Sequence, residues 1–385
     1  MKVALLKNQI PPYRVEFLER LATKVELLVV LDTDVEECRD WVINPQALGF
    51  KCVIQGKSGV RYHKKRPDLG YTEESYFHLS GAVVAELKSF EPDLIVSAEF
   101  GMRSLRAMLY ARGRNVPVVI WWEGTSHTEM GESRLKMPVR RLLCRRAAGF
   151  FSNGTESTSY LLSLGGDRRF VMEGMTGIST QQYLEEMTRL QPLRAEHRTK
   201  FGLGGTVLLF VGSLSQRKGV RQMLDALQRV VDRGVHDFSL LLVGEGDQRP
   251  YVEKFSRDNP DVCVRITGFI DPSEIFIYYS IADLFVLPTV LDNWPLVTIE
   301  ALSCGLPQMI SKYNGAASDL GRDSRLGIVM DPMDTQKFSE DLERLIQDPL
   351  PRLDQEVVDH YTDFYSPESQ ARRASELFES IIDSK

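Results

Sequence analysis

The sequence predicts an α/β protein built from two doubly wound parallel sheets. Short apolar runs alternate with helix-length segments from one end of the chain to the other. These runs are continuous rather than alternating, as in parallel strands that helices cover on both faces. A length of 385 residues indicates two domains of ordinary size. Because strands that alternate with helices form βαβ units, we expect two Rossmann-like domains.

Ten segments carry the apolar runs and are expected to be strands. In the first half they are 2–6, 25–31, 93–98, 117–122 and 148–153. In the second half they are 206–212, 238–244, 264–269, 282–289 and 307–311. Both series have the same rhythm, which predicts two sheets of similar build.

The domain boundaries follow from where this rhythm stops. We place an N-terminal domain at 1–172, a linker region at 173–205, where apolar periodicity is lost, and a C-terminal domain at 206–365. Residues 366–385 are expected to form a helix that crosses back to the N-terminal domain. Its apolar residues recur at helical spacing: Ala371, Ala374, Leu377, Phe378 and Ile381.

Composition restricts the class of protein and its compartment. Apolar residues make up 43% of the chain and charged residues 26%, as in globular proteins with large cores. No apolar run approaches the roughly 18–20 residues of a membrane-spanning helix. The N-terminal apolar run is too short for a signal-peptide core and is better interpreted as a first buried strand. Five scattered cysteines with no CxxC pair favour a reducing cytoplasm.

The charge of −6 is unevenly distributed. Through residue 180 there are 25 basic and 21 acidic residues, whereas the remainder has 22 and 32. Basic residues cluster at 61–66 and 134–146, and an acidic chain with such patches is a poor nucleic-acid binder. The clusters are either solvated faces or contacts for an anionic membrane or a phosphorylated acceptor.

The second basic cluster also has helical periodicity. Its apolar residues, Leu135, Val139, Leu142 and Leu143, fall at helical spacing. This pattern predicts a helix that packs on the sheet with its arginines outward. The same pattern would suit a domain that leans on anionic lipid.

Four segments of the C-terminal domain carry the features of a ligand site. Three are loops after strands: 211-VGSLSQRKG-219, 242-LVGEGDQRPYVE-253 and 264-VRITGFIDPSEI-275. Doubly wound folds bind ligands at the carboxyl ends of their strands, and a lysine there is a natural phosphate partner. Neither a P-loop nor a GxGxxG fingerprint is present. Taken alone, the first loop is more simply explained by an exposed lysine, and the second by an ordinary glycine turn.

The fourth segment, 292-DNWPLVTIEALSCGLP-307, places two acids around a helix start. The unpaired N–H groups and the dipole at a helix N-terminus favour an anion. Glu300 lies about 7.5 Å further along the axis at about 1.5 Å per residue, so the ribose of a nucleoside diphosphate bound there would be within its reach. Asp292 would reach the group on the other side of the phosphate.

Taken together and in this order, the four segments resemble the retaining glycosyltransferases of family 4. The resemblance is dense over about 206–330 and thin before residue 180. It implies the GT-B architecture, two Rossmann-like doubly wound domains with a cleft between them. It also implies transfer of a sugar from a nucleoside diphosphate sugar, UDP-sugars favoured, to a glycan or lipid-linked acceptor in polysaccharide or glycoconjugate biosynthesis.

The resemblance assigns roles to residues of the donor site. Asp292 would contact the transferred sugar, Glu300 the ribose and Lys218 the phosphates. The remaining expected donor-binding residues are the helix-start amides of Leu296, Val297 and Thr298, the base-packing pair Phe269 and Ile270, and Ser213, Arg217, Glu245 and Asn293.

Three positions depart from the pattern of the family. Asp292 stands where glutamate is usual, and Ser213 stands where arginine is usual, so Arg217 is expected to assist Lys218. The usual glycine loop after the first strand is replaced by 8-NQIPPYRVEF-17. The loop 119-VIWWEGTSHTE-129 supplies two further candidates for the catalytic centre, Glu123 and His127, although a loop histidine is commonly structural and Glu123 could simply accept from loop amides.

No metal or other cofactor is expected, because the resemblance implies a metal-independent site; the short 32-DTD-34 is interpreted as a chance match. The protein is expected in the cytoplasm, with contact to the inner membrane face as one option. Two alternatives remain open: a sugar-nucleotide epimerase or phosphorylase of the same architecture, and a non-catalytic sugar-nucleotide-binding subunit.

Overall fold

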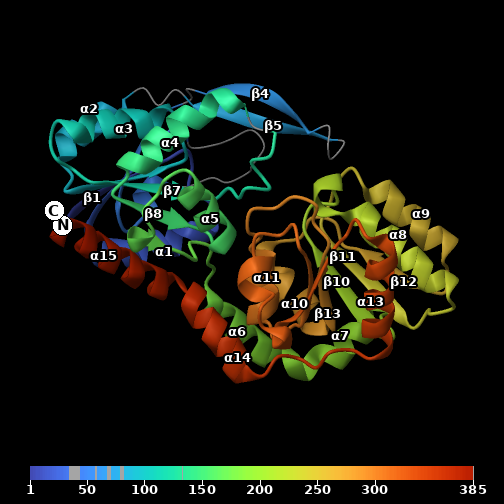
Figure 1. The fold of residues 1–385 in the computed structure, drawn as a ribbon. Coiled ribbons are helices and arrows are strands. Elements are labelled where there is room, and N and C mark those ends of the chain that lie inside the picture. Colours follow the sequence, from blue (N-terminus) through green and yellow to red (C-terminus); the bar gives the residue numbers. More distant parts are fainter. Residues whose placement is uncertain (34–43, 57–58, 67–70, 79–81, 132, 385) are drawn as a thin grey trace. The chain divides into compact units, whose positions relative to one another are not determined.

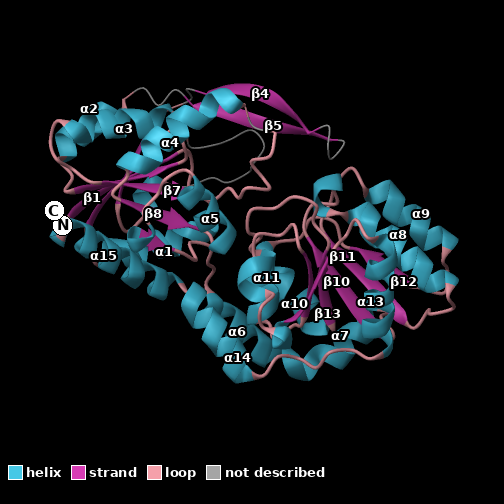
Figure 2. Ribbon diagram, viewed as in Figure 1, coloured by secondary structure: helices cyan, strands magenta, loops and turns pink. Residues whose placement is uncertain are grey.

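The computed structural model describes residues 1–33, 44–56, 59–66, 71–78, 82–131 and 133–384, and these form two compact units. Unit 1 comprises Met1–Ser179 and Phe364–Lys385, and unit 2 comprises Thr180–Asp363. Each unit is built around one parallel sheet with helices against it (Figures 1 and 2). The predicted α/β class with two doubly wound parallel sheets is confirmed.

Unit 1 contains a seven-stranded sheet in the order β3-β2-β1-β6-β7-β8-β9. Its strands are β1 (Lys2–Lys7), β2 (Glu26–Leu31), β3 (Lys51–Ile54), β6 (Leu94–Ala98), β7 (Val118–Trp122), β8 (Gly149–Ser152) and β9 (Val171–Met172). Its helices are α1 (Val15–Ala22), α2 (Val83–Phe90), α3 (Met102–Arg112), α4 (Met137–Arg146), α5 (Thr155–Ser163) and α15 (Pro367–Asp383). A separate antiparallel hairpin joins β4 (Gly59–Arg66) to β5 (Tyr71–His78), so the basic run 61–66 lies on a strand.

Alternate residues of the unit 1 strands serve two cores, one on each face of the sheet. Val3 and Leu5 of β1 pack in one core with residues of α1 and α15, among them Phe17 and Phe378. Ala4 and Leu6 of the same strand pack in the other core with residues of α2 to α5. Because both faces are covered, the strands have continuous apolar sequences, which is why they could be recognised from the sequence.

Unit 2 contains a six-stranded sheet in the order β12-β11-β10-β13-β14-β15. Its strands are β10 (Thr206–Val211), β11 (Phe238–Val243), β12 (Cys263–Ile266), β13 (Leu284–Leu287), β14 (Gln308–Ser311) and β15 (Gly327–Met330). Its helices are α6 (Thr180–Leu190), α7 (Arg194–Phe201), α8 (Val220–Asp232), α9 (Arg249–Asp258), α10 (Ile275–Ile281), α11 (Val297–Ser303), α12 (Ala317–Leu320) and α13 (Thr335–Gln347). Helix α14 (Gln355–Tyr365) runs across the unit boundary. Helix α8 packs on α9 and α13, and α10 packs on α6 and α7.

Several elements were not expected from the sequence. The strands β3, β9 and β15 are too short or too polar to give an apolar run, and α6 and α7 lie within the segment 173–205, which had been assigned to a linker. In the described part of the chain, no helix is long and apolar enough to cross a bilayer.

The expected outward orientation of the arginines over 134–146 is confirmed for Arg141, Arg145 and Arg146 and is wrong for Arg140, and the apolar residues are not all turned inward. Leu143 is buried, but Leu135, Val139 and Leu142 are 87%, 44% and 46% exposed. Arg140 points inward instead and donates through Nη1 to Glu129 Oε2 and to the Tyr160 hydroxyl, both at 2.5 Å. The buried side of α4 therefore has one arginine satisfied by an acid and a phenol, and the opposite side exposes leucine and valine.

Candidate functional site

The loop after β10 and the loop after β13 meet at the carboxyl edge of the unit 2 sheet. Gly219 makes this possible, because it has a φ of 74° and a Cβ there would lie 1.9 Å from the Pro288 carbonyl oxygen. The carbonyl of Arg217 accepts from the Val290 N–H and from the Thr289 hydroxyl, each at 2.9 Å. Arg217 Nη1 donates to the Leu291 carbonyl at 3.2 Å.

This contact brings three of the predicted residues together. Lys218 Nζ lies 2.6 Å from Asp292 Oδ2, and Arg217 Nη1 lies 3.6 Å from the same oxygen. Lys218 and Asp292 are nearly buried. Burial alone would raise the pKa of Asp292, but attraction to Lys218 and Arg217 outweighs it and lowers the pKa below its usual 3.8. The phosphate partner and the sugar-contacting acid of the sequence prediction are thus paired with each other.

Glu300 lies inside α11 and is held by tyrosines that sequence reasoning did not identify. The Tyr279 hydroxyl donates to Glu300 Oε2 at 2.7 Å, and Tyr183 of α6 lies near the same carboxylate. Burial raises the pKa of Glu300 above 4.5, and the two tyrosines oppose the rise only in part. The sequence does not indicate this contact, because an aromatic residue such as Tyr279 in α10 is also typical of an ordinary core.

The helix start has fewer available amides than expected. The Thr298 N–H donates to the Pro295 carbonyl at 3.2 Å, so the turn uses it internally. Leu296 and Val297 remain as the amides of the first turn, whose N–H groups lack intrahelical partners by geometry. The Thr298 hydroxyl accepts from the Asn314 amide at 3.4 Å, which connects α11 to the loop after β14.

The other predicted donor-binding residues occupy neighbouring loops. Phe269 is 87% exposed and follows Gly268, which bridges to Gly244 across the loops after β12 and β11. Ile270 is half-buried. Ser213 and Ser215 share a hydrogen bond of 3.1 Å, and Glu245 forms an ion pair with Arg249. Asn293 is half-buried, and its Oδ1 lacks a hydrogen-bond partner among the described residues.

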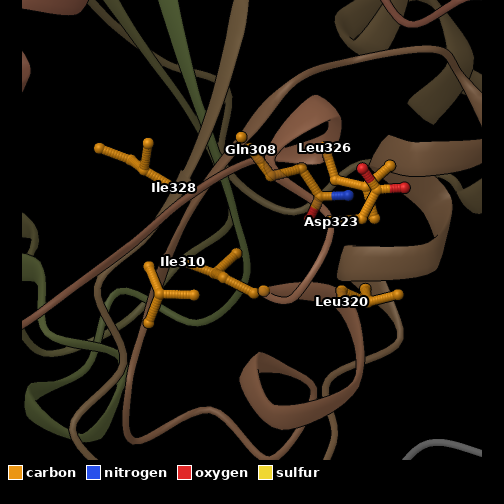
Figure 3. Close-up of a pocket in the computed structure, with 9 residues that line it drawn as sticks. Gln308, Ile310, Leu320, Asp323, Leu326 and Ile328 are labelled. Atoms are coloured by element: carbon orange, nitrogen blue, oxygen red, sulfur yellow. The ribbon is translucent and has the colours of Figure 1, made fainter.

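A small pocket between β14, β15 and α12 does not belong to this site. Gln308, Ile310 and Ile328 line it together with Leu320 and Leu326, and the Gln308 side chain extends toward Asp323 and Leu326 (Figure 3). Its cavity of about 10 Å³ has room for about one water molecule. It therefore cannot hold a nucleotide.

In unit 1, Glu123 pairs with two cations. Its Oε1 lies 3.6 Å from Lys7 Nζ and 3.5 Å from Arg14 Nη2. His127 is half-buried in the following turn, which the Thr125 N–H stabilises by donating to the Thr128 hydroxyl at 2.9 Å. Asp32 of the expected chance match is buried and forms an ion pair with Arg103, whereas Asp34 lies outside the described residues. No group of three or more metal-ligating side chains occurs among the residues that the structure describes.

Comparison with known proteins shows that part of the chain is similar to glycosyltransferases. Residues 205–348 match the family model described as glycosyl transferases group 1. The alpha-D-kanosaminyltransferase of Streptomyces kanamyceticus is 33% identical over 159 residues, 40% of this chain and 40% of that protein. The GDP-mannose-dependent alpha-(1-6)-phosphatidylinositol dimannoside mannosyltransferase of Mycobacterium tuberculosis is 28% identical over 277 residues, 69% of each chain.

Solved structures with the same fold extend over the whole chain. HepE of Anabaena in complex with UDP superposes with a TM-score of 0.72 at 18% identity, covering 99% of this chain and 100% of that one. Sucrose-phosphate synthase of Thermosynechococcus elongatus gives 0.70 at 15% identity and covers both chains completely. These matches show the GT-B architecture. The sequence matches, in contrast, span only 40% and 36% of the first two relatives.

Proposed function

We propose that this protein is a retaining glycosyltransferase that moves a sugar from a nucleoside diphosphate sugar, with UDP favoured as the nucleotide, to a glycan or lipid-linked acceptor. One observation carries the proposal: Arg217, Lys218 and Asp292 meet at the carboxyl edge of the unit 2 sheet, directly before the helix that bears Glu300. This cluster lies inside the segment that matches the group 1 glycosyltransferases. The UDP bound to HepE, a protein of the same fold, supports the choice of nucleotide.

The geometry supports a division of labour in the transfer. Lys218, assisted by Arg217 and the Leu296 and Val297 amides, stabilises the negative charge that develops on the departing diphosphate. A diphosphate beside Lys218 competes with Asp292 for that cation. Asp292 then becomes available to a hydroxyl of the transferred sugar, and Glu300, fixed by Tyr279, accepts from the ribose hydroxyls.

Nucleotide preference and reaction class are tested separately. A thermal-shift comparison of UDP, GDP, ADP and TDP identifies the base, because a ligand that binds only the folded state raises its melting temperature. Radiolabelled UDP-sugars then distinguish the reactions: slow release of free sugar and UDP supports a transferase. Epimer formation would establish an epimerase, and saturable binding without turnover would establish a binding subunit.

The lysine has its own test. Lys218→Met should weaken UDP binding by about 1.5–3 kcal/mol, the range for hydrogen bonds to charged groups, and should change uridine binding much less. Lys254→Met is the matched control, because Lys254 is exposed and pairs with Asp258 on α9. Equal losses for UDP and uridine would contradict a phosphate role for Lys218.

We further propose that α4 places unit 1 against an anionic cytoplasmic membrane surface, where a lipid-linked acceptor would be found. The outer side of α4 and the 3₁₀ turn Arg134–Lys136 before it combine the exposed Leu135, Val139 and Leu142 with four exposed basic residues: Lys136, Arg141, Arg145 and Arg146. At about 1 kcal/mol for each basic residue near the surface, changing the three arginines to serine should weaken binding to anionic vesicles about 100-fold.

Liposome co-sedimentation at low salt measures this contact. Arg140 stays unchanged, because it is buried against Glu129. The control is a triple serine variant of three exposed basic residues of unit 2, Lys254, Arg257 and Arg344. Equal loss in both triple variants, or no binding of the wild type to anionic vesicles, would refute a specific contact through α4.

A further inference from the structure

A second cluster of charged side chains lies at the carboxyl edge of the unit 1 sheet. Lys7 is the last residue of β1, whereas Asp32, Glu99 and Glu123 each directly follow a strand, β2, β6 and β7 respectively. The strand order runs from β1 to β2 and β3 on one side and to β6 and β7 on the other. The cluster therefore lies where the winding reverses, which is where doubly wound sheets bind ligands.

Two cations of this cluster share one aromatic support. Lys7 Nζ lies 4.7 Å from the centroid of Trp121, and the Arg14 guanidinium lies 4.8 Å from it. Arg14 arrives on the 3₁₀ turn Pro12–Arg14, in the segment that replaces the glycine loop expected after the first strand. Both cations are buried, and burial lowers the pKa of Lys7.

The Glu123 carboxylate, the anion nearest to these cations, makes only long contacts with them. One oxygen of Glu123 faces both of them, at 3.6 and 3.5 Å, longer than the roughly 2.7–2.9 Å of charge-assisted hydrogen bonds. Arg14 Nε and Nη1 are buried without an acceptor among the described residues. Such orphan donors in a guanidinium are costly, since each forfeits its hydration without a replacement.

The neighbouring pair shows what a structural ion pair in this sheet looks like. Arg103 forms a short ion pair with Asp32, which is buried, and donates through Nη2 to the Ala98 carbonyl at 3.0 Å, although Arg103 Nε and Asp32 Oδ1 also lack partners among the described residues. Glu123, by comparison, is 38% exposed while its cationic partners are 11% and 4% exposed. Of the three side chains Lys7, Arg14 and Glu123, the Glu123 carboxylate is therefore the one with room to move away.

We propose that Lys7 and Arg14 form a binding site for an oxyanion, a carboxylate or a phosphate carried by the acceptor, and that Glu123 is the exchangeable counter-ion of this site. The inference rests on the proposed transferase function, because it assigns the acceptor to unit 1. A ligand oxyanion supplies two or more acceptor oxygens to a planar guanidinium, a match that the single Glu123 oxygen does not provide. Negative charge on the acceptor is thereby a determinant of specificity.

Titration with inorganic phosphate tests the site directly. The titration is done on the full chain at constant ionic strength and followed by tryptophan emission, since Trp121 lies beside both cations; the Trp121→Phe variant identifies the signal. Lys7→Met should lower phosphate affinity at least tenfold, and Arg14→Met should do likewise. Lys88→Met, an exposed lysine on α2, is the matched control and should leave the affinity unchanged.

Glu123→Gln provides the second, opposite-signed test. Because it removes the competing carboxylate and keeps the shape, it should raise phosphate affinity several-fold. This substitution is at a partly exposed position, so it tests the site even if Arg14→Met fails to fold. Unchanged affinity in Lys7→Met, or weaker binding in Glu123→Gln, would overturn the proposal.

Assays of sugar transfer distinguish a carboxylate from a phosphate as the bound oxyanion. They also distinguish failure of the anion site from failure of the proposed transferase function. Inhibition of sugar transfer is measured with phosphate, acetate, glucuronate and glucose. Lys7→Met should relieve inhibition by the three anions and leave any inhibition by glucose unchanged. Phosphate binding at Lys7 in a chain that binds no nucleotide would refute the transferase function and leave the anion site standing. Turnover of a UDP-sugar by a chain that binds no phosphate would refute the anion site and leave the transferase function standing.

Discussion

The pairing of Lys218 with Asp292 makes a quantitative prediction about coupling. At an effective dielectric constant of about 20, charges 2.6 Å apart attract by about 6 kcal/mol, and Arg217 at 3.6 Å adds about 5 kcal/mol. Desolvation of the buried groups offsets most of this attraction. Removing one partner of a buried pair typically costs about 3–5 kcal/mol. Because Arg217 remains, we expect Lys218→Met to destabilise unit 2 by about 2–3 kcal/mol.

A double-mutant cycle measures this coupling. Asp292→Asn alone leaves two cations facing each other and should also cost about 2–3 kcal/mol, whereas the double variant should cost about 2 kcal/mol less than the sum. Hydrogen exchange of the β10 and β13 amides reports the stability of unit 2 separately from unit 1. Lys254→Met should cost less than about 0.5 kcal/mol, as expected for an exposed pair. Additivity of the two single variants within about 0.5 kcal/mol would refute the inferred coupling.

The Asp292→Asn variant of this cycle also tests nucleotide binding and sugar transfer. With its carboxylate neutralised, Lys218 no longer has a strong competitor for the diphosphate, so Asp292→Asn should bind UDP more tightly than the wild type while its rate of sugar transfer falls. Calorimetry with UDP and single-turnover assays with a UDP-sugar measure the two effects. Weaker UDP binding in a folded Asp292→Asn variant would mean that Asp292 does not restrain Lys218.

Three further predictions concern Glu300 and the cofactor requirement. The raised pKa of Glu300 means that the folded chain holds a proton more tightly than the unfolded chain, so its contribution to stability is complete below about pH 4.5 and is lost as pH rises through the folded pKa. Glu300→Gln should abolish that loss, which urea unfolding at a series of pH values from about 4.5 upward detects, and should weaken UDP binding. Tyr279→Phe should cost about 1.5–3 kcal/mol at neutral pH, and distinctly less in the Glu300→Gln background; equal costs would exclude a charge-assisted bond. Transfer is expected to persist in excess EDTA, and restoration of a lost activity by Mg²⁺ or Mn²⁺ would contradict the metal-independent reaction.

The sequence predicted the sheets better than the loops, for a physical reason. Strands covered on both faces, such as β1 and β10, are continuous apolar runs, and their order imposes the two-sheet architecture. Short strands such as β9 bury too few residues to leave a pattern. The orientation of α4 could not be predicted, because a buried arginine matched to Glu129 and Tyr160 has the same sequence signature as an exposed one.

The candidate sites differ in the same way: residues set by local sequence were predicted, and contacts between distant segments were not. Asp292, Lys218 and Glu300 were found because their spacing around strand ends and a helix start is local in sequence. The Tyr279 contact to Glu300 and the placement of Arg14 over Trp121 depend on packing between distant segments, which one sequence does not display. Lys7 could have been suspected, since a lysine that ends a central buried strand has few ways of reaching water.

The return of the chain to unit 1 sets an order for folding during synthesis. Unit 2 is contiguous, so all its residues have been made by Asp363, but the core of unit 1 still lacks Ala371, Ala374, Phe378 and Ile381 of α15. The face of the sheet that α15 covers, together with α1, stays partly open until α15 has left the ribosome. A nascent or C-terminally truncated chain thus presents a finished unit 2 beside an unfinished unit 1, and its exposed apolar face is a natural target for chaperones and proteases. Synthesis of α15, rather than completion of either sheet, is the event that commits unit 1 to its folded state.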